Sequence, residues 1–351
     1  MGEVFLNASA YRRTLNTSLI YKVEFGIMGS MKNVCVSMLA ATISVMAGAV
    51  CGADDDFLFI GTSGLGHVTP AATFPFGMVQ AGPDTSAKPD RFVPDWAHTC
   101  GYQHDDAWLW RFSQTHISGT GCLAFGDFGL LPFVDGFDGA SRPAKMVKNS
   151  ERAVPGRYAV TIEEDGAVIG CEMTALAHSA GYRFRYPEGK KAKLLLDLDW
   201  GIGGVWKKGC WGKKVLSCAC EFPTATTVRG GHEMWIWNDY RFHFSAEFSA
   251  PVVSRRLLRK ADGLRGEIYE LEFGAVPGGV LEMRIGLSTR SPEAAAKNLA
   301  AEMPSFDFAG SAAKSAAEWA GLLGHVGTDE GRLGHTRPLR LLSVRPDARR
   351  V

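Results

Sequence analysis

Histidines, tryptophans and acidic residues are interleaved with glycines throughout the stretch from Phe59 to Pro132. The repeated glycines require the backbone to turn sharply many times, as neither a helix nor a plain strand needs to. Imidazole and carboxylate groups on rigid loops bind ligands or move protons, although a single loop histidine is more often a hydrogen-bonded structural group. We therefore expect this segment to form the rim of a binding site. Its candidate side chains are His67, Trp96, His104, His116 and Asp127.

Three familiar kinds of site do not fit the same segment. The glycines of Gly61–Gly66 stand in the wrong order for a dinucleotide fingerprint, and Pro70 interrupts any following helix. Ser118 is flanked by glycine but lacks the spacing of a hydrolase nucleophile elbow. Asp105 and Asp106 are adjacent, so on a strand they would face opposite ways and could not act as a paired acid and base. We expect no catalytic residue of these types here.

Three tryptophans of the segment are candidates for binding sugar, because a pyranose ring presents a C–H face that stacks on an indole. They are Trp96, Trp108 and Trp110. Most tryptophans are nevertheless core residues. The formal net charge of +1 gives no acidic or basic field that would indicate binding to nucleic acid or to a membrane surface.

The elements that must position these loops are mainly strands. Apolar residues alternate with polar ones in short runs separated by turn residues, as in half-buried antiparallel strands. Each such sheet must cover its apolar face with another, which predicts a mainly β fold, an antiparallel sandwich. A proline-containing helix start at Ser291 then predicts a helix to Met303, and a second helix follows at 310–323, with Ala313, Ala317, Trp319 and Leu322 on one side. The strands are expected at 158–162, 168–172, 182–186, 193–199, 226–229, 240–244, 267–273 and 281–287.

The first fifty-three residues are expected to lie outside the fold. The apolar run 34–50 is short for a membrane span and is followed by small residues and three aspartates, which predicts a signal peptide at about 28–53. Residues 1–27 lie upstream of a better start at Met28 or Met31. The protein is thus expected in the periplasm or outside the cell, with no transmembrane span after signal removal. A lipoprotein anchored at Cys51 is the alternative.

Export changes how the cysteines are interpreted, because some of them could pair in an oxidising compartment. Cys210, Cys218 and Cys220, with His232 beyond them, superficially suggest a metal site. Paired zinc ligands usually have about two to four residues between them, whereas one residue separates Cys218 from Cys220. The sequence therefore predicts no metal here.

A succession of motifs resembles the N-terminal domain of glycoside hydrolase family 92, which comprises exported bacterial exo-acting α-mannosidases. The motifs are FIGTSGLGHVTPAATFPFGMVQAGPDT, CGYQHDD, FSQTHISGTGC and GDFGLLP, followed by PGRYAVTIEEDG and IGLSTRSPEAAAKNLAAEMPSFDF. The resemblance covers roughly residues 55–330. Two departures are mild: Gln114 stands where the family usually has histidine, and Ala71 replaces a glycine.

The resemblance implies a β-supersandwich, joined through a short helical linker to a C-terminal (α/α)6 barrel. It also implies calcium-dependent, inverting hydrolysis of mannose-containing glycans, with the acid, the base and the calcium site mainly in the barrel. No catalytic residue, metal ligand or cofactor is therefore expected in this chain. Trp96 best matches a tryptophan of the leaving-group subsite. Residues that match motif positions facing the cleft or the domain interface are His67, His116, Ser118, Gly119, Thr120 and Gly121.

We expect the main departure from the family to be the absence of the C-terminal (α/α)6 barrel. We expect an extension and signal peptide at 1–53, the supersandwich at 54–289, the linker at 290–325 and an aberrant arginine-rich tail at 326–351. The leading hypothesis is the N-terminal domain of a mannosidase, inactive alone because the (α/α)6 catalytic domain is its missing partner. The alternatives are a free-standing carbohydrate-binding module and one half of a split mannosidase.

Overall fold

The computed structural model describes residues 55–92, 95–134, 138, 142–164, 166–203, 212–236 and 238–325. The predictions of a signal peptide, of an anchor at Cys51 and of an arginine-rich tail lie outside the described residues, as does Cys210.

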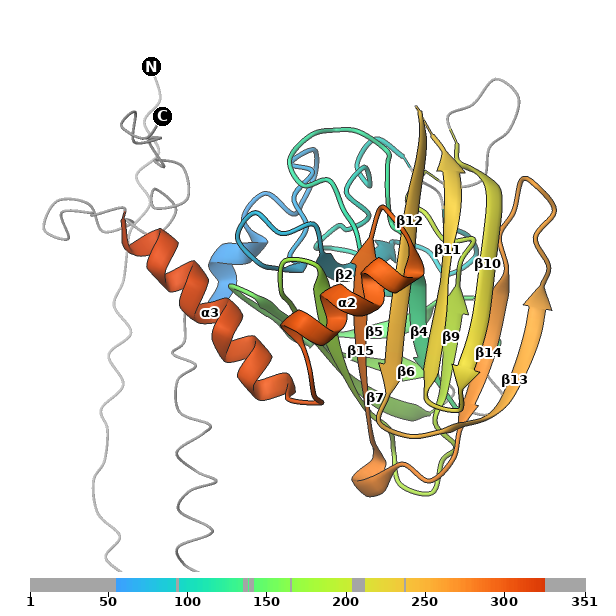
Figure 1. Cartoon of the computed structure of the whole chain (residues 1–351). Helices are drawn as coiled ribbons and strands as arrows, with labels where there is room; N and C mark the ends of the chain where they lie inside the picture. The colour runs from blue at the N-terminus through green and yellow to red at the C-terminus, as the bar shows by residue number, and fades with distance from the viewer. Residues whose placement is uncertain are drawn as a thin grey trace, which may run out of the picture. The chain divides into compact units, whose positions relative to one another are not determined.

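The fold is built almost entirely from strands, with a short helical region at its end (Figure 1). In chain order the strands are β1 Ala72–Thr73, β2 Gln80–Ser86, β3 Trp108–Ser113, β4 Gly129–Phe133, β5 Ala144–Val154, β6 Arg157–Glu164, β7 Ala167–Ala175, β8 Ser179–Arg185, β9 Lys193–Asp197, β10 Lys214–Thr224, β11 Thr227–Trp235, β12 Asp239–Phe248, β13 Val252–Arg259, β14 Ile268–Phe273 and β15 Val280–Ser288. The helices are α2 Pro292–Glu302 and α3 Phe308–Gly324, with 3₁₀ turns η1 Asp55–Phe59 and η2 Pro277–Gly279.

The strands form one curled sheet whose two halves face each other. Its order is β10-β11-β12-β15-β8-β7-β6-β5-β3-β4-β9-β14-β13, and β2 carries β1 beside β3. The pairings along this path are antiparallel, including β12 with β15 and β4 with β9. The predicted mainly β, antiparallel supersandwich followed by a short helical region is therefore confirmed.

Period-two alternation decides which side chains enter the core. Along β6 the alternate residues Tyr158, Val160 and Ile162 are buried, and along β8 Tyr182 and Phe184 are fully buried. The rings of Tyr182 and Phe184 stack with their centroids 5.8 Å apart. Burying such aromatic and branched side chains between two sheet faces supplies most of the driving force for this fold.

Helix α2 begins where the sequence predicts. Ser291 is its N-cap, and the Ser291 Oγ accepts a hydrogen bond of 3.1 Å from the Ala294 N–H. The helix buries Ala295 and Leu299 against β15, where Gly286 leaves room for the close approach of the helix backbone. The absence of a side chain at Gly286 thus lets α2 pack closely against the sheet.

Helix α3 packs through only part of the side that the sequence predicts. Ala313 and Ala317 are exposed, whereas Phe308 and Ser315 are buried. The Trp319 Nε1–H donates a 2.7 Å hydrogen bond to the carbonyl oxygen of Thr73. The prediction is therefore wrong for the two alanines, because contacts with β1 and the β5–β6 turn decide which side of this helix is covered.

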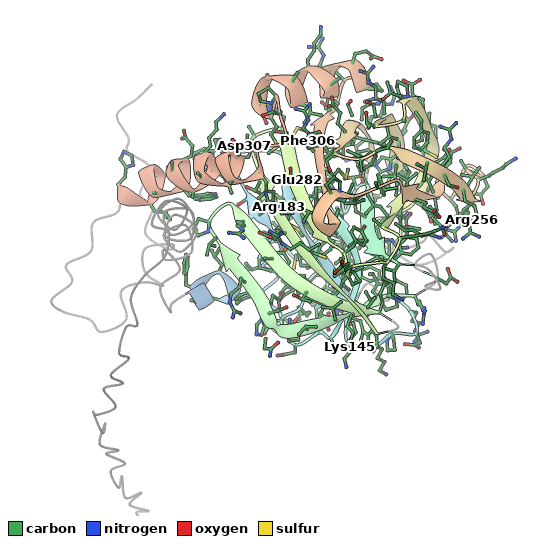
Figure 2. All side chains as sticks on the ribbon, turned by 90° about the horizontal axis from the view of Figure 1, so that it is seen from below. Lys145, Arg183, Arg256, Glu282, Phe306 and Asp307 are labelled. Atoms are coloured by element: carbon green, nitrogen blue, oxygen red, sulfur yellow. The ribbon has the colours of Figure 1, made fainter. Side chains whose placement is uncertain are left out.

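Charged groups fix the start of α3 to the sheet. Figure 2 shows Arg183 and Glu282 close to Phe306 and Asp307, where the chain crosses β8 and β15. Arg183 Nη2 lies 2.7 Å from Glu282 Oε1, and its guanidinium lies 4.6 Å from the ring centre of Phe308. A cation held over an aromatic face adds modest stabilisation to the ion pair.

The described cysteines are free thiols, so the pairing that export would permit is not observed among them. They are Cys100, Cys122, Cys171, Cys218 and Cys220.

Candidate functional site

The loops of the segment Phe59–Pro132 gather beside β2, β3 and β4 at one end of the sandwich, drawn in blue to cyan in Figure 1. Strand β2 is buried along nearly its whole length and pairs with β3. Because these strands are fixed inside the fold, the loops that leave them have rigid ends.

Trp96 is the most exposed tryptophan of these loops, with 62% of its surface accessible. Its ring meets the ring of His67 edge-on, with the centroids 5.8 Å apart and the planes at 83°. Gly121 lies against both: a Cβ added there would be 3.5 Å from the Trp96 ring and 3.6 Å from His67 Nε2. Three predicted site residues, Trp96, His67 and Gly121, are therefore brought together, and we call them the rim cluster.

His67 is fixed in an unusual backbone conformation. Its φ is 56°, in the left-handed region that few residues other than glycine adopt. The Thr99 hydroxyl lies 2.7 Å from His67 Nδ1, and the Gly119 N–H donates to the His67 carbonyl oxygen. A strained residue that several contacts hold in place is typical of functional sites.

A buried glutamine ties the Trp96 turn, residues 95–98, to the glycine-rich loop before it. The Gln103 amide donates to the carbonyl oxygen of Gly64 at 3.0 Å and also to that of Ala97. The Gln103 backbone N–H donates to the Thr85 hydroxyl at 3.1 Å, on β2. Trp96 thus stands on a turn that is anchored to the core.

A second anchor of the same turn is ionic. His98 lies between two carboxylates, with Nδ1 2.6 Å from Asp95 Oδ1 and Nε2 2.9 Å from Asp106 Oδ2. Burial lowers the pKa of His98, but the hydrogen bonds and charges of Asp106 and Asp95 outweigh it, so that pKa is raised above its ordinary 6.5. For Asp95, burial raises the pKa and the contacts with His98 lower it, with a net lowering.

His116 lies inside the fold and does not face the surface. Its Nδ1 lies 2.7 Å from the Gln80 carbonyl oxygen and its Nε2 3.2 Å from Asp84 Oδ1. Asp84 also accepts a 2.6 Å hydrogen bond from Trp200 Nε1. The side chain of His116 therefore holds the base of the loops together and is not placed to contact a ligand.

The turn 118–121 is exposed beside the rim cluster. Gly119 and Gly121 have φ values of 81° and 43°, and Thr120 is exposed. The Ser118 Oγ accepts a 3.3 Å hydrogen bond from the Thr69 N–H. Ser118 also lines an apolar groove of about 560 Å³ between the segment 57–80, the β5–β6 turn and α3.

Beneath the loops lies a buried polar group centred on Asp127. Its Oδ1 lies 2.6 Å from His232 Nε2 and accepts a 3.2 Å bond from the Tyr240 hydroxyl, while Thr115 donates to Oδ2. His232 Nδ1 faces the Leu198 carbonyl oxygen at 3.0 Å. Asp127 and His232 are fully buried and mutually satisfied, so this group braces the two sheet halves.

Gln114, the departure within the FSQTH motif, is accommodated in the core. The Tyr182 hydroxyl donates to Gln114 Oε1 at 2.9 Å, and Gln114 Nε2 donates to the Phe128 carbonyl oxygen at 3.2 Å. The amide therefore bridges β8 and the loop before β4, and its two polar atoms are paired.

Within the described residues, no group of three or more histidine, cysteine, aspartate or glutamate side chains is arranged to hold a metal ion. No helix in the described part of the chain is long and apolar enough to cross a membrane.

The sequence singled out Trp96, His67 and Gly121 but not the residues that hold them in place. The Trp96 turn is fixed by His98, Gln103 and Asp106. The base of the loops is organised by the hydrogen bond between Trp200 and Asp84. The clustered polar residues around CGYQHDD were the available signal, but nothing in their spacing reveals which of them meet in space.

Residues 58–288 match the Glycosyl hydrolase family 92 N-terminal domain. An "Uncharacterized secreted glycosidase" of Arthroderma benhamiae is 29% identical over 154 residues, which cover 40% of this chain and 19% of that protein.

Solved relatives share the fold. A family GH92 alpha-mannosidase from Bacteroides thetaiotaomicron is 25% identical with a TM-score of 0.66, over 78% of this chain and 39% of its own. The complex of that enzyme with mannoimidazole is 25% identical, with a TM-score of 0.65, over 77% of this chain and 37% of its own. A family GH92 inverting mannosidase from the same species, at 21% identity and a TM-score of 0.59 over 77% and 35%, shows the same fold.

This chain spans less than two-fifths of the length of those solved relatives and about a fifth of the fungal glycosidase. The matched residues nevertheless make up more than half of its 351 residues. The chain therefore belongs to the glycosyl hydrolase family 92, as a member with that family's N-terminal domain.

Proposed function

We propose that this chain is the carbohydrate-binding N-terminal domain of a calcium-dependent, inverting exo-α-mannosidase that acts on mannose-containing glycans. The observation that carries the proposal is the exposed indole of Trp96, fixed by His67 and Gly121 at the loop end of a family 92 domain. A rigid, accessible indole can stack on a sugar ring at little entropic cost. Trp96 would form part of the leaving-group subsite, beside the exposed turn 118–121.

Hydrolysis is assigned to an (α/α)6 catalytic domain that completes the cleft. Inversion requires two carboxyl groups about 6.5–9.5 Å apart, one to protonate the leaving oxygen and one to activate water. Asp95 and Asp106, the carboxylates bonded to the Trp96 turn, are both engaged with His98. Neither is free to serve as acid or base, which supports our proposal that this chain alone is inactive.

Calcium is likewise assigned to the catalytic domain. Calcium takes about six to eight oxygen ligands, usually with several carboxylates. The described residues offer no group of three or more histidine, cysteine, aspartate or glutamate side chains, so they lack the clustered carboxylates that this ion usually takes. In the proposed enzyme the present domain binds and orients sugar, and the partner domain supplies the metal.

Calorimetric titration of the chain with an α-mannoside tests the binding role. We expect Trp96→Ala to weaken binding on the order of tenfold, since truncating an anchoring aromatic costs about 2 kcal/mol or less at a small site. Trp235→Ala, on β11, is the matched control and should bind like the unmodified chain. Unchanged affinity in Trp96→Ala would remove Trp96 from the site.

Assays with α-mannosides and calcium separate the enzymatic alternatives. We expect no turnover by this chain alone, and robust turnover would refute the assignment of catalysis to another domain. Activity restored by adding a separately produced family barrel favours a split enzyme. Binding without any such reconstitution favours a free-standing carbohydrate-binding module.

We further propose that the chain is exported to the periplasm or beyond, in line with the secreted glycosidase among its relatives. The intact mass of the exported protein distinguishes cleavage near residue 53 from lipid attachment at Cys51. A full-length mass in the exported fraction would contradict both.

A further inference from the structure

The position of the Trp96 indole depends on a charged residue two positions along the chain. Trp96 itself is mostly exposed and makes its described ring contact only with the edge of His67. Its backbone turn is closed by Asp95, whose Oδ1 accepts the N–H groups of Ala97 at 2.9 Å and His98 at 3.0 Å. Asp95 therefore holds the turn that carries Trp96 from one side, while the Gln103 amide holds it through the Ala97 carbonyl oxygen.

His98 orients Asp95. Its two ring nitrogens face carboxylate oxygens, Asp95 Oδ1 at 2.6 Å and Asp106 Oδ2 at 2.9 Å. Both contacts are hydrogen bonds only when both nitrogens carry hydrogen, which is the imidazolium form. We call Asp95, His98 and Asp106 the His98 clamp.

The inner end of the clamp is fixed in the sheet. Asp106 Oδ2 also accepts a 2.7 Å bond from the hydroxyl of Thr85 on β2. The Asp106 side chain is 4% exposed and that of His98 11%, whereas that of Asp95 is 55% exposed. The clamp thus runs from a buried anchor to the exposed turn that carries Trp96.

The acidic groups that act on the His98 ring are those of the clamp. Asp106 approaches from the loop before β3 and Asp95 from the Trp96 turn, while β2 contributes the neutral hydroxyl of Thr85. Gln103, which also holds this turn, is neutral. The charge state of His98 is therefore balanced between its burial and these two carboxylates.

We propose that His98 is a positioning residue for Trp96: its imidazolium closes the Trp96 turn at Asp95 and presents the indole at the rim, and loss of its proton loosens the Asp95 end of that turn. A neutral ring donates through one nitrogen only, so a lone pair then faces the other carboxylate and repels it. Asp95 gives way because it is exposed, while Asp106 stays bonded to Thr85.

The direction of the pH dependence follows from the clamp. The pKa of His98 is raised above 6.5, because the two carboxylates outweigh the opposing effect of burial. The stability that the charged His98 ring contributes to the folded protein is fully present below pH 6.5. It is lost as pH rises through the higher pKa that His98 has in the folded state. The pKa of Asp95 is lowered from its ordinary 3.8. The stability that Asp95 contributes is therefore present above pH 3.8 and is lost as pH falls through the lower pKa of the folded state.

Contact between the positioned indole and sugar rests on the proposed function. The His98 clamp itself is tested without sugar. The full chain is labelled with 5-fluorotryptophan, and Trp96→Phe assigns the Trp96 resonance among the nine tryptophans. Fluorine NMR spectra from about pH 5 to about pH 9 follow the environment of that ring across the histidine range. We expect its chemical shift to titrate with a midpoint above 6.5.

Three variants make the measurement specific. In His98→Gln the Trp96 resonance should lose the transition with a midpoint above 6.5. Asp106→Asn should move the midpoint to lower pH, and Asp95→Asn, at an exposed position that folding tolerates, should do the same. His178→Gln is the matched control, because His178 pairs with Glu302 at 2.8 Å on α2 and should leave the curve unchanged.

A Trp96 resonance that is independent of pH, or that titrates identically in His98→Gln and Asp95→Asn, overturns the positioning role. Mannoside affinity is then measured across the same pH range and should fall several-fold through the same midpoint. If the resonance titrates and no mannoside binds at any pH, the proposed function fails while the clamp stands. If mannoside binds with pH-independent affinity, the clamp does not serve binding.

Discussion

Asp84 illustrates how one buried carboxylate organises a whole set of loops. It stands on β2, accepts a hydrogen bond from Trp200 after β9, and has its Oδ1 3.2 Å from His116 Nε2 before β4. It also lies directly against Gly101, where no side chain intrudes. Three segments that are distant in sequence therefore converge on one buried carboxylate, and two of them make polar contacts with it, through Trp200 and His116.

Gly101→Ala tests this convergence at the residue scale. Gly101 has a φ of 87°, and an added Cβ would collide with the Asp84 carboxylate. We expect a loss of about 2–3 kcal/mol in the free energy of unfolding, from backbone strain plus displacement of Asp84. Chemical denaturation measures it.

Gly189→Ala is the control for Gly101→Ala. Gly189 has a φ of 73° but open space around its Cβ, so this variant carries strain without a collision. Equal losses in the two variants would show that the contact with Asp84 is unimportant.

At the scale of elements, α3 depends on two turns far away in sequence. Gly156, in the β5–β6 turn, leaves room for Ser315, and the Ser315 and Trp319 side chains both donate to the Thr73 carbonyl oxygen of β1. Ser315 and Trp319 lie one helical turn apart, so these polar contacts hold one side of α3. Leu323 of the same helix lines the apolar groove.

Trp319→Phe removes one of these contacts while keeping an aromatic ring. We expect the free energy of unfolding to fall by about 1 kcal/mol, the usual net value of one hydrogen bond, and the melting temperature by about 2–4 °C. Faster proteolysis within α3 would accompany the change. Trp108→Phe, which removes no described hydrogen bond, should leave both measurements unchanged, and a similar drop in that control would contradict our account of Trp319.

The strands and the start of α2 were predictable because local signals decide them. Alternation along β6 and β8 places Tyr158 and Tyr182 in the core, and Ser291 with Pro292 marks a helix start. The covered face of α3 was not predictable, since Thr73 and Gly156 lie far from it in sequence. The His98 clamp was missed for the same reason: its connection to Thr85 exists only after β2 and the loop before β3 have paired.

At the scale of the whole molecule, backbone and side-chain contacts close the curled sheet where its ends meet. The edge strand β10 contacts the β13–β14 end through a Val215 N–H bond to the Leu264 carbonyl oxygen, a Glu267 N–H bond to Cys218 Sγ, and the rings of Phe222 and Tyr269, 5.6 Å apart. This seam protects an edge that would otherwise offer unpaired backbone groups.

The apolar groove beside α3 is left open in the same molecule. Phe76, on its wall, is 95% exposed, and Ile60 is 54% exposed. Exposed apolar surface of this kind promotes association in water. In the proposed enzyme a partner domain would be the natural cover for this face, beside Ser118 and the rim cluster.

Removing Phe76 therefore changes how the chain behaves in concentrated solution. We expect the chain to show concentration-dependent association by light scattering, and Phe76→Asn to reduce it, because asparagine is polar and tolerates the φ of 58° found at this position. Val168→Thr is the control: Val168 is 52% exposed on β7, away from the groove, and its replacement should leave association unchanged. A monomer at all concentrations would refute the prediction, as would equal effects of the two substitutions, because the groove would then not be the surface through which copies meet.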